Sequence, residues 1–89
     1  MTVRRRIVAR GRVQGVFFRD SVRSRAESRG VAGWVTNRPD GAVEAVFEGE
    51  PDPVDSMVRY MGDGPPQAEV EGVEVVPEEP EGLSDFRVR

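Results

Sequence analysis

Residues 11–19 (GRVQGVFFR) contain the groups best suited to bind a phosphate. Gly15 can adopt backbone conformations that let successive N–H groups converge on an anion, and Arg19 can donate two parallel hydrogen bonds to it. Asn37 is a second candidate, because its neutral amide can hold a water beside an anion without repelling the anion. The same residues also fit an ordinary strand-to-helix turn with a solvated arginine, and a hairpin end. Taken alone, the residue pattern favours these plainer interpretations.

The composition excludes most catalytic schemes. The chain has 89 residues, contains no His and no Cys, and all 13 of its basic residues are arginines. Thiolate chemistry, disulfides and the usual zinc, copper and iron sites therefore lack their ligands, and we expect no metal site. General acid–base catalysis near neutral pH lacks histidine, its usual residue. The glutamates of the C-terminal region fit a solvated loop better than a magnesium site; they are Glu78, Glu79 and Glu81.

The charge balance gives no support to a nucleic-acid partner. The formal net charge is −3, whereas binding to a phosphate backbone requires clustered basic residues. The basic N-terminal segment is not followed by an apolar stretch, and no apolar run is long enough to cross a bilayer. We therefore expect a cytoplasmic protein with no membrane partner. We also expect a monomer, although none of these features determines the oligomeric state.

The candidate loop must be positioned by the elements on either side of it. Apolar residues and arginines alternate over residues 3–13, which predicts a strand with one buried face and one open face. We expect all arginines except Arg19 to be solvated, including those on the open face of this strand: Arg4, Arg6, Arg10 and Arg12. An apolar residue at every fourth position predicts a helix over residues 18–29, and Gly30 is a suitable stop.

Asn37 ends a second predicted strand, residues 31–37. The turn sequence RPDG at residues 38–41 then connects this strand to a third, residues 42–47, as a hairpin. N-cap and proline preferences predict the start of the next helix. The remaining predicted elements are that helix, with Asp52 as N-cap and Pro53 as its first residue, a strand over residues 68–76, an acidic loop over residues 77–82 and a possible short strand over residues 86–88.

This order of elements is that of the split βαβ arrangement. We predict a single α+β domain over residues 1–89 with a ferredoxin-like βαββαβ fold. Its four-stranded antiparallel sheet has two helices on one face and the second strand at one edge. The fold hosts many unrelated functions and does not by itself identify an activity.

Two long segments resemble the acylphosphatase family. They are GRVQGVFFR at residues 11–19 and GWVTNRPDGAVEAVFEG at residues 33–49, and GPPQAEVEGVEV at residues 64–75 is a weaker third. With the chain length and the order of elements, the resemblance extends over essentially the whole chain. It implies an enzyme that hydrolyses the carboxyl–phosphate bond of acyl phosphates without a cofactor or metal.

The resemblance also implies roles for individual residues. Arg19 matches the arginine of the family that binds the phosphate, and Asn37 matches the asparagine that positions the attacking water. The implied phosphate cradle is formed by the backbone amides of Gln14, Gly15, Val16, Phe17 and Phe18. This chemistry suits the composition, because the carboxylate leaving group is a weak base that needs no protonation, and phosphoryl transfer depends mainly on positioning and electrostatics.

Two other classes of function fit the same fold. An RNA-binding module requires stacking aromatic residues on the first and third strands, where this chain has arginines, glutamates and valines, and where Phe47 is predicted to face the helices. A non-catalytic domain that senses phosphate or another anion is the main alternative to the enzyme, since it uses the same loop. The two are distinguished by hydrolysis, because the sensing domain would bind phosphate without turnover, whereas the enzyme would hydrolyse its substrate.

Overall fold

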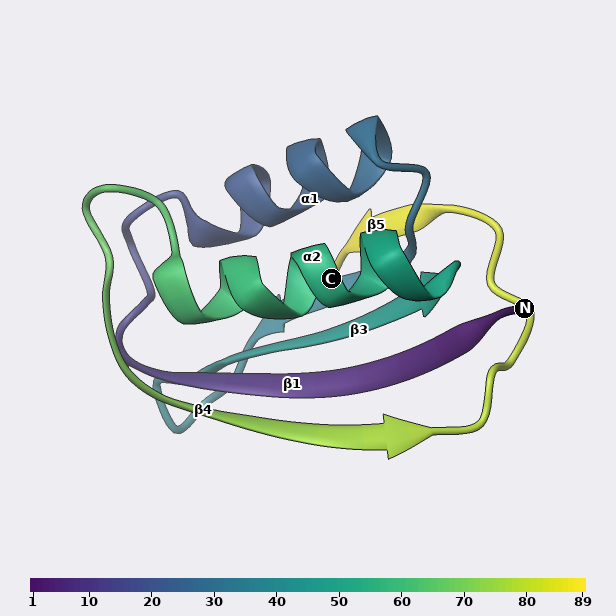
Figure 1. Cartoon of the computed structure of the whole chain (residues 1–89). Helices are drawn as coiled ribbons and strands as arrows, with labels where there is room; N and C mark the ends of the chain where they lie inside the picture. Colours follow the sequence, from purple (N-terminus) through teal and green to yellow (C-terminus); the bar gives the residue numbers. More distant parts are fainter.

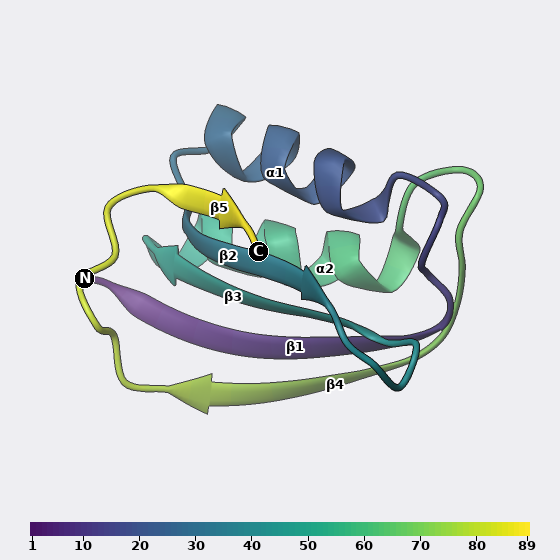
Figure 2. The ribbon, with the colours of Figure 1, turned by 180° about the vertical axis from the view of Figure 1, so that it is seen from behind.

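The computed structural model describes all residues, 1–89, as two helices packed on one face of a five-stranded sheet (Figures 1 and 2). The predicted α+β ferredoxin-like fold with two helices on one face is confirmed. In chain order the elements are β1 (Val3–Arg12), α1 (Phe18–Ser28), β2 (Ala32–Asn37), β3 (Val43–Gly49), α2 (Pro51–Asp63), β4 (Glu69–Glu78) and β5 (Phe86–Val88).

The prediction of a four-stranded antiparallel sheet is wrong. The strand order is β4-β1-β3-β2-β5, and β5 pairs in parallel with β2, so the sheet is mixed and β2 is not an edge strand. The C-terminal segment is held there by backbone hydrogen bonds from Gly33 N–H to the Asp85 carbonyl and from Arg89 N–H to the Val35 carbonyl, both 2.9 Å. Phe86 is buried, and its ring stacks on Phe47 with 5.9 Å between the ring centroids.

The alternation of residues along β1 and β3 produces the core. These strands are antiparallel neighbours in the middle of the sheet, and α2 packs on both of them. The first helix, α1, packs beside it on β2 and β5, so both helices lie on one face of the sheet, as predicted. Burial of each large apolar side chain stabilises the fold by about 1.5–3 kcal/mol. The fully buried residues of the core between the sheet and the helices include Ile7, Ala9, Ala45 and Phe47 from the sheet, Val22 and Ala26 from α1, and Val54, Met57 and Met61 from α2.

The first helix begins at Phe18 as predicted and ends one residue early, at Ser28, before Gly30 with its positive φ of 68°. The prediction of Asp52 as the N-cap of the second helix is wrong. That helix begins at Pro51 with Glu50 as N-cap. A helix tolerates proline throughout its first turn, because those N–H groups have no intrahelical acceptor, so both Pro51 and Pro53 fit. Neither helix is long and apolar enough to cross a membrane.

The prediction that Arg4 is solvated is also wrong. Its side chain is only 3% exposed, and its guanidinium lies 2.6 Å from the equally buried carboxylate of Glu48 and 2.8 Å from that of Glu78. Glu78 belongs to β4, which continues two residues beyond the predicted strand, and the acidic segment after it folds over Arg4. Backbone N–H groups of that segment donate to Glu48, namely those of Glu81, Gly82 and Leu83.

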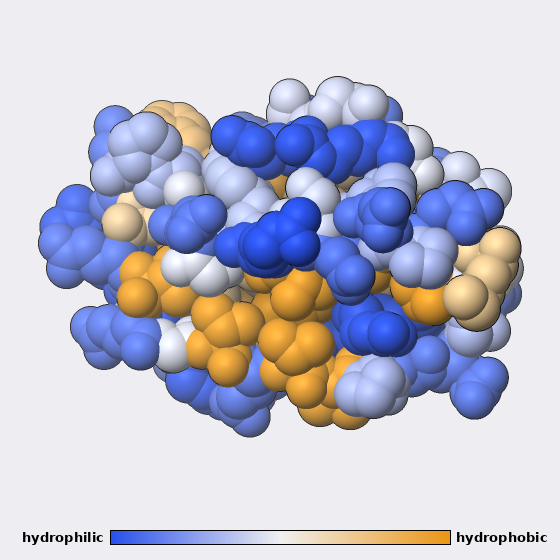
Figure 3. Space-filling view, viewed as in Figure 1, coloured by the Kyte–Doolittle hydropathy of each residue, from blue (hydrophilic) through white to orange (hydrophobic).

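The helices leave one strip of the sheet uncovered, along the edge strand β4. Val73 and Val75 lie opposite Ala9 and Ile7 in the β1–β4 register and so point to the helix face, yet they are 36% and 46% exposed. In the space-filling view, apolar side chains gather below the helices on this side of the molecule (Figure 3). The candidate loop lies elsewhere, at the end of β1 where α1 begins (Figure 1).

Candidate active site

The loop between β1 and α1 has an unusual backbone. Gly15 and Phe17 have positive φ angles of 74° and 62°, and Phe17 is the one residue other than glycine with a positive φ. Alternation of left- and right-handed residues turns successive N–H groups toward one side of the chain and forms a concave anion-binding nest. The left-handed conformation costs a residue other than glycine roughly 1–2 kcal/mol, so the shape of this loop is maintained against local strain.

The N–H groups of the loop have no acceptor within the protein. No backbone hydrogen bond uses the amides of Gln14 to Phe17 as donors. Phe17, the N-cap of α1, also gives the helix no side-chain cap. The first turn of a helix has unpaired N–H groups and a positive dipole end. The loop and the helix start therefore present their donors together, as a site for an anion.

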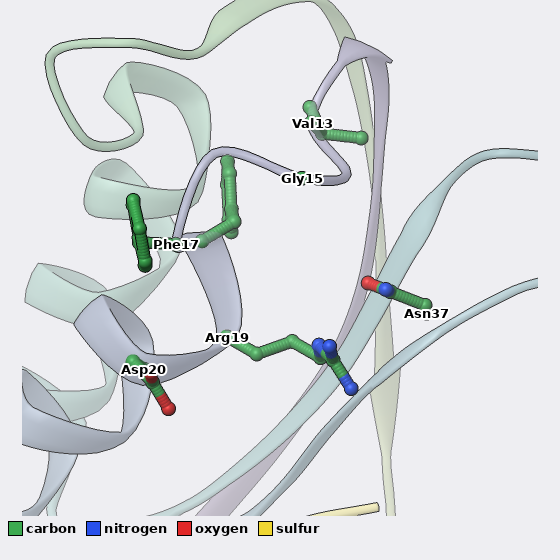
Figure 4. A pocket seen from close by; sticks show the side chains of 7 residues that line it. Val13, Gly15, Phe17, Arg19, Asp20 and Asn37 are labelled. Atoms are coloured by element: carbon green, nitrogen blue, oxygen red, sulfur yellow. The ribbon is translucent and has the colours of Figure 1, made fainter.

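Arg19 adds a positive charge to these donors. It is half-buried in the first turn of α1. The arginines of the ion pairs are Arg4, Arg6, Arg10, Arg38 and Arg87, so the guanidinium of Arg19 is not neutralised by a carboxylate. Figure 4 shows its side chain extending toward β2, where Asn37 points back at it from the opposite side.

Asn37 is the last residue of β2 and pairs with Val43 at the start of β3. Its backbone carbonyl accepts a hydrogen bond from the Thr36 hydroxyl at 3.3 Å, and its side-chain amide makes none within the protein. The turn after it is closed by Asp40, whose carboxylate accepts the Ala42 N–H at 3.1 Å. That hydrogen bond, with the neighbouring guanidinium groups of Arg38 and Arg10, holds the pKa of Asp40 below its usual value. Asn37 is thus carried by a hairpin whose turn is closed by hydrogen bonds.

A pocket of about 320 Å³ joins the two segments. Five of the predicted site residues line it, and the other two predicted residues, Gln14 and Val16, do not. The Val16 side chain is buried in the core, and that of Gln14 faces the β2–β3 turn. The lining consists of Val13, Gly15, Phe17, Phe18, Arg19, Asp20 and Asn37.

Sequence reasoning did not identify Val13 and Asp20 as part of the pocket. Val13 reads as a strand residue, and it is the first residue after β1. Asp20 reads as an ordinary acidic residue in a first helical turn, where it favours the helix dipole. The glutamates Glu78, Glu79 and Glu81 do not gather into a group that could hold a metal ion.

The open face of the sheet lacks the surface of an RNA-binding module. The single aromatic residue on β1 or β3 is Phe47, which is fully buried beneath the helices. On the open face, Arg6 forms ion pairs with Glu44 and Glu78. These two strands therefore offer no aromatic platform for base stacking.

Comparisons with known proteins agree on one family. The family model described as Acylphosphatase matches residues 5–88. An acylphosphatase of Rubrobacter xylanophilus is 62% identical over 90 aligned residues, which cover 99% of this chain and 81% of that protein. The structure of an acylphosphatase from Coxiella burnetii superposes with a TM-score of 0.94 at 43% identity, covering 99% of this chain and 93% of that one. The crystal structure of acylphosphatase from Bacillus subtilis gives 0.93 at 39% identity, with 100% and 99% coverage.

Proposed function

The chain belongs to the acylphosphatase family and is an acylphosphatase, and we propose that it hydrolyses acyl phosphates in the pocket between the β1–α1 loop and Asn37. The observation that carries this proposal is the convergence of three features on one pocket. They are the loop N–H groups without acceptors, the guanidinium of Arg19 without a carboxylate partner, and the side-chain amide of Asn37.

The loop and Arg19 bind the phosphoryl group in this proposal. The backbone amides from Gln14 to Phe18 donate to its oxygens, and Arg19 adds two parallel charge-assisted hydrogen bonds. These donors are fixed before the substrate arrives, because the loop is anchored by the buried side chains of Val16 and Phe18. Preorganised donors need no rearrangement when negative charge develops on the phosphoryl oxygens, which is where such donors lower the barrier most.

Asn37 positions the attacking water. Its amide oxygen accepts a hydrogen bond from the water, and its lack of charge avoids repulsion of the phosphate. The water oxygen forms a bond to phosphorus as the bond from phosphorus to the acyl oxygen breaks, and that electron pair leaves with the carboxylate. The products are a carboxylate and inorganic phosphate.

The proton of the water passes to a phosphate oxygen of the substrate itself. The carboxylate leaves without protonation, since it is a weak base, and the loose transition state of phosphoryl transfer requires little help from a general base. A reaction that needs no general base agrees with the lining of the pocket, which contains one carboxylate, that of Asp20, and no histidine, cysteine or lysine. An acid limb of the pH–rate profile that disappears in Asp20→Asn would contradict this step, because a carboxylate that acts as general base must be deprotonated.

We propose that the active unit is a monomer, because the pocket of a single chain already combines the loop, Arg19 and Asn37. Gel filtration under assay conditions tests this point. The cytoplasmic location expected from the sequence stays a prediction.

Hydrolysis of benzoyl phosphate in the presence of EDTA tests the proposal. Wild type should turn over, and Arg19→Ala should lose at least about 3–4 kcal/mol of transition-state stabilisation, because an oriented donor and its charge are both removed. Arg23→Ala is the matched control, since Arg23 is exposed on the same helix; it should retain wild-type rates. A folded wild type that binds inorganic phosphate without turnover would identify an anion-sensing domain.

A further inference from the structure

The side chain of Gln14 makes a connection that the phosphate cradle does not require. Its Nε2 donates one hydrogen bond to the carbonyl oxygen of Arg38, at 2.9 Å, and another to that of Ala42, at 3.0 Å. Both partners are acceptors only, so the nitrogen end of the amide must face them. Both hydrogens of the amide nitrogen are therefore used, and the half-buried side chain has a fixed orientation.

The two carbonyls belong to the turn that follows Asn37. Within this turn the Arg38 N–H donates to the Ala42 carbonyl at 2.8 Å, and the Gly41 N–H donates to the Arg38 carbonyl at 3.1 Å. The turn is thus closed by its own hydrogen bonds, and Gln14 fastens it as a unit. Any displacement of this unit moves Asn37, which is the residue immediately before the turn.

Gln14 links two parts of the site that the backbone leaves separate. The loop carries the phosphate-binding amides and the hairpin carries Asn37, and no backbone hydrogen bond joins residues 13–17 to that hairpin. The pairing of β1 with β3 ends at Ala9 and Val43. Beyond that point there is an ion pair between Arg10 and Asp40, 3.2 Å apart, but both side chains are exposed and such pairs contribute little.

From these contacts we infer that the Gln14 side chain is a positioning residue for hydrolysis: it holds Asn37, and the water that Asn37 orients, in line with the phosphorus bound by the loop. The inference rests on the proposed function, because it requires Asn37 to position the nucleophile. The Gln14 side chain itself touches neither phosphate nor water. Its effect is geometric, and a misplacement of about 1 Å can reduce a rate by roughly 100-fold.

Gln14→Met tests the inference, because methionine preserves the length of the side chain and the backbone N–H but cannot donate to the two carbonyls. We expect kcat for benzoyl phosphate to fall by roughly 10- to 100-fold. The inhibition constant of inorganic phosphate, which reports on the cradle, should stay close to that of wild type. Gln67→Met is the matched control, since Gln67 is the other glutamine of the chain and is exposed; it should behave as wild type.

A double-mutant cycle with Asn37→Ala separates positioning from general damage. In the Asn37→Ala background, Gln14→Met should change kcat by no more than about twofold, because the group that it positions is gone. Equal losses in both backgrounds, or a loss confined to phosphate affinity, overturn the inference while the proposed function stands. If Asn37→Ala alone leaves kcat unchanged, the proposed role of Asn37 fails and the inference fails with it.

Gln14→Glu provides a second test if Gln14→Met does not fold, as judged by circular dichroism. Two carbonyl oxygens facing the new carboxyl would raise its pKa, and only its protonated form could donate a hydrogen bond, through its single O–H, to one of them. The kcat of Gln14→Glu relative to wild type should therefore rise as the pH falls. A deficit that is constant with pH in a folded Gln14→Glu protein overturns the inference.

Discussion

Replacement of Glu48 by alanine should strongly destabilise the fold and leave the chemistry of the pocket intact. Glu48 is 2% exposed, and its carboxylate accepts a hydrogen bond from the Arg4 guanidinium at 2.6 Å. It also accepts the backbone N–H groups of Glu81, Gly82 and Leu83 at distances between 2.9 and 3.2 Å. One carboxylate therefore neutralises a buried charge and holds the segment that leads into β5.

The magnitude follows from the groups that would lose their partner. Removal of one member of a buried ion pair typically costs about 3–5 kcal/mol, because the other charge is left uncompensated. Arg4 retains the Glu78 carboxylate at 2.8 Å, which places the loss at the lower end of that range. The three N–H groups lie in a segment that water can reach, so their contribution is at most about 1 kcal/mol. For a domain of this size, a total of about 3–4 kcal/mol lowers Tm by roughly 12–30 °C.

Thermal and urea unfolding followed by circular dichroism measure this loss. Glu79→Ala is the matched control, because Glu79 is exposed and forms none of the ion pairs of this cluster; it should shift the free energy of unfolding by no more than about 0.5 kcal/mol. A loss below about 1 kcal/mol for Glu48→Ala would refute the reasoning, since it would mean that Arg4 is not left with an uncompensated buried charge.

The same carboxylate makes stability depend on pH in the acid range. Burial alone would raise the pKa of Glu48, but hydrogen bonds from the Glu81 N–H, the Arg4 guanidinium and the Leu83 N–H together hold it below its ordinary value of 4.5. As the pH falls, the carboxylate of Glu48 therefore takes up a proton in the unfolded chain before it does so in the folded chain. The stabilisation that this carboxylate provides is complete above pH 4.5 and is lost as the pH falls through the lower pKa of the folded state. Glu48→Gln lacks this titration. Between about pH 5 and pH 3 its free energy of unfolding should therefore decrease less than that of wild type.

Three further predictions concern the pocket. Arg19→Lys should lose nearly as much kcat/KM as Arg19→Ala, because lysine lacks the two-pronged donor geometry; full activity in steady-state assays would exclude bidentate binding. Asn37→Ala should lower kcat more than it raises KM, as expected of a group that acts on the water, and a change in KM alone would argue against that role. Phe17→Gly should raise Tm or leave it unchanged, because glycine adopts the φ of 62° without strain and Phe17 is 72% exposed, whereas Phe17→Val should lower Tm. The reverse order of these two Tm values would show that the loop is not strained.

The elements that local sequence determines were predicted well. The alternation in β1, the turn sequence between β2 and β3, and the apolar spacing of α1 each depend on residues close together in the chain, and each element forms close to its predicted place. The parallel pairing of β5 with β2 depends instead on the contact of Phe86 with Phe47, which are far apart in the sequence. The burial of Arg4 likewise requires an acidic segment from the other end of the chain.

The candidate site likewise contains residues that the sequence predicts and a contact that it does not predict. The resemblance to acylphosphatases selected Arg19 and Asn37, and the pocket contains both. The side-chain role of Gln14 was not predicted, because its partners are backbone carbonyls, and a carbonyl has the same chemistry at every position of a sequence. A polar residue within an otherwise apolar loop was the one available signal, and that signal does not specify a partner.

The buried ion-pair network and the proposed phosphate-binding loop lie at opposite ends of β1. At its N-terminal end, Arg4 lies in a buried network in which the charged groups are paired. At its C-terminal end, the loop has N–H groups without acceptors, a phenylalanine in a strained conformation and a helix without a side-chain cap. Each of these features raises the free energy of the fold, and each is what a preorganised anion site requires. The β1–β3 core between the two ends supplies the stability that allows the strained loop to persist.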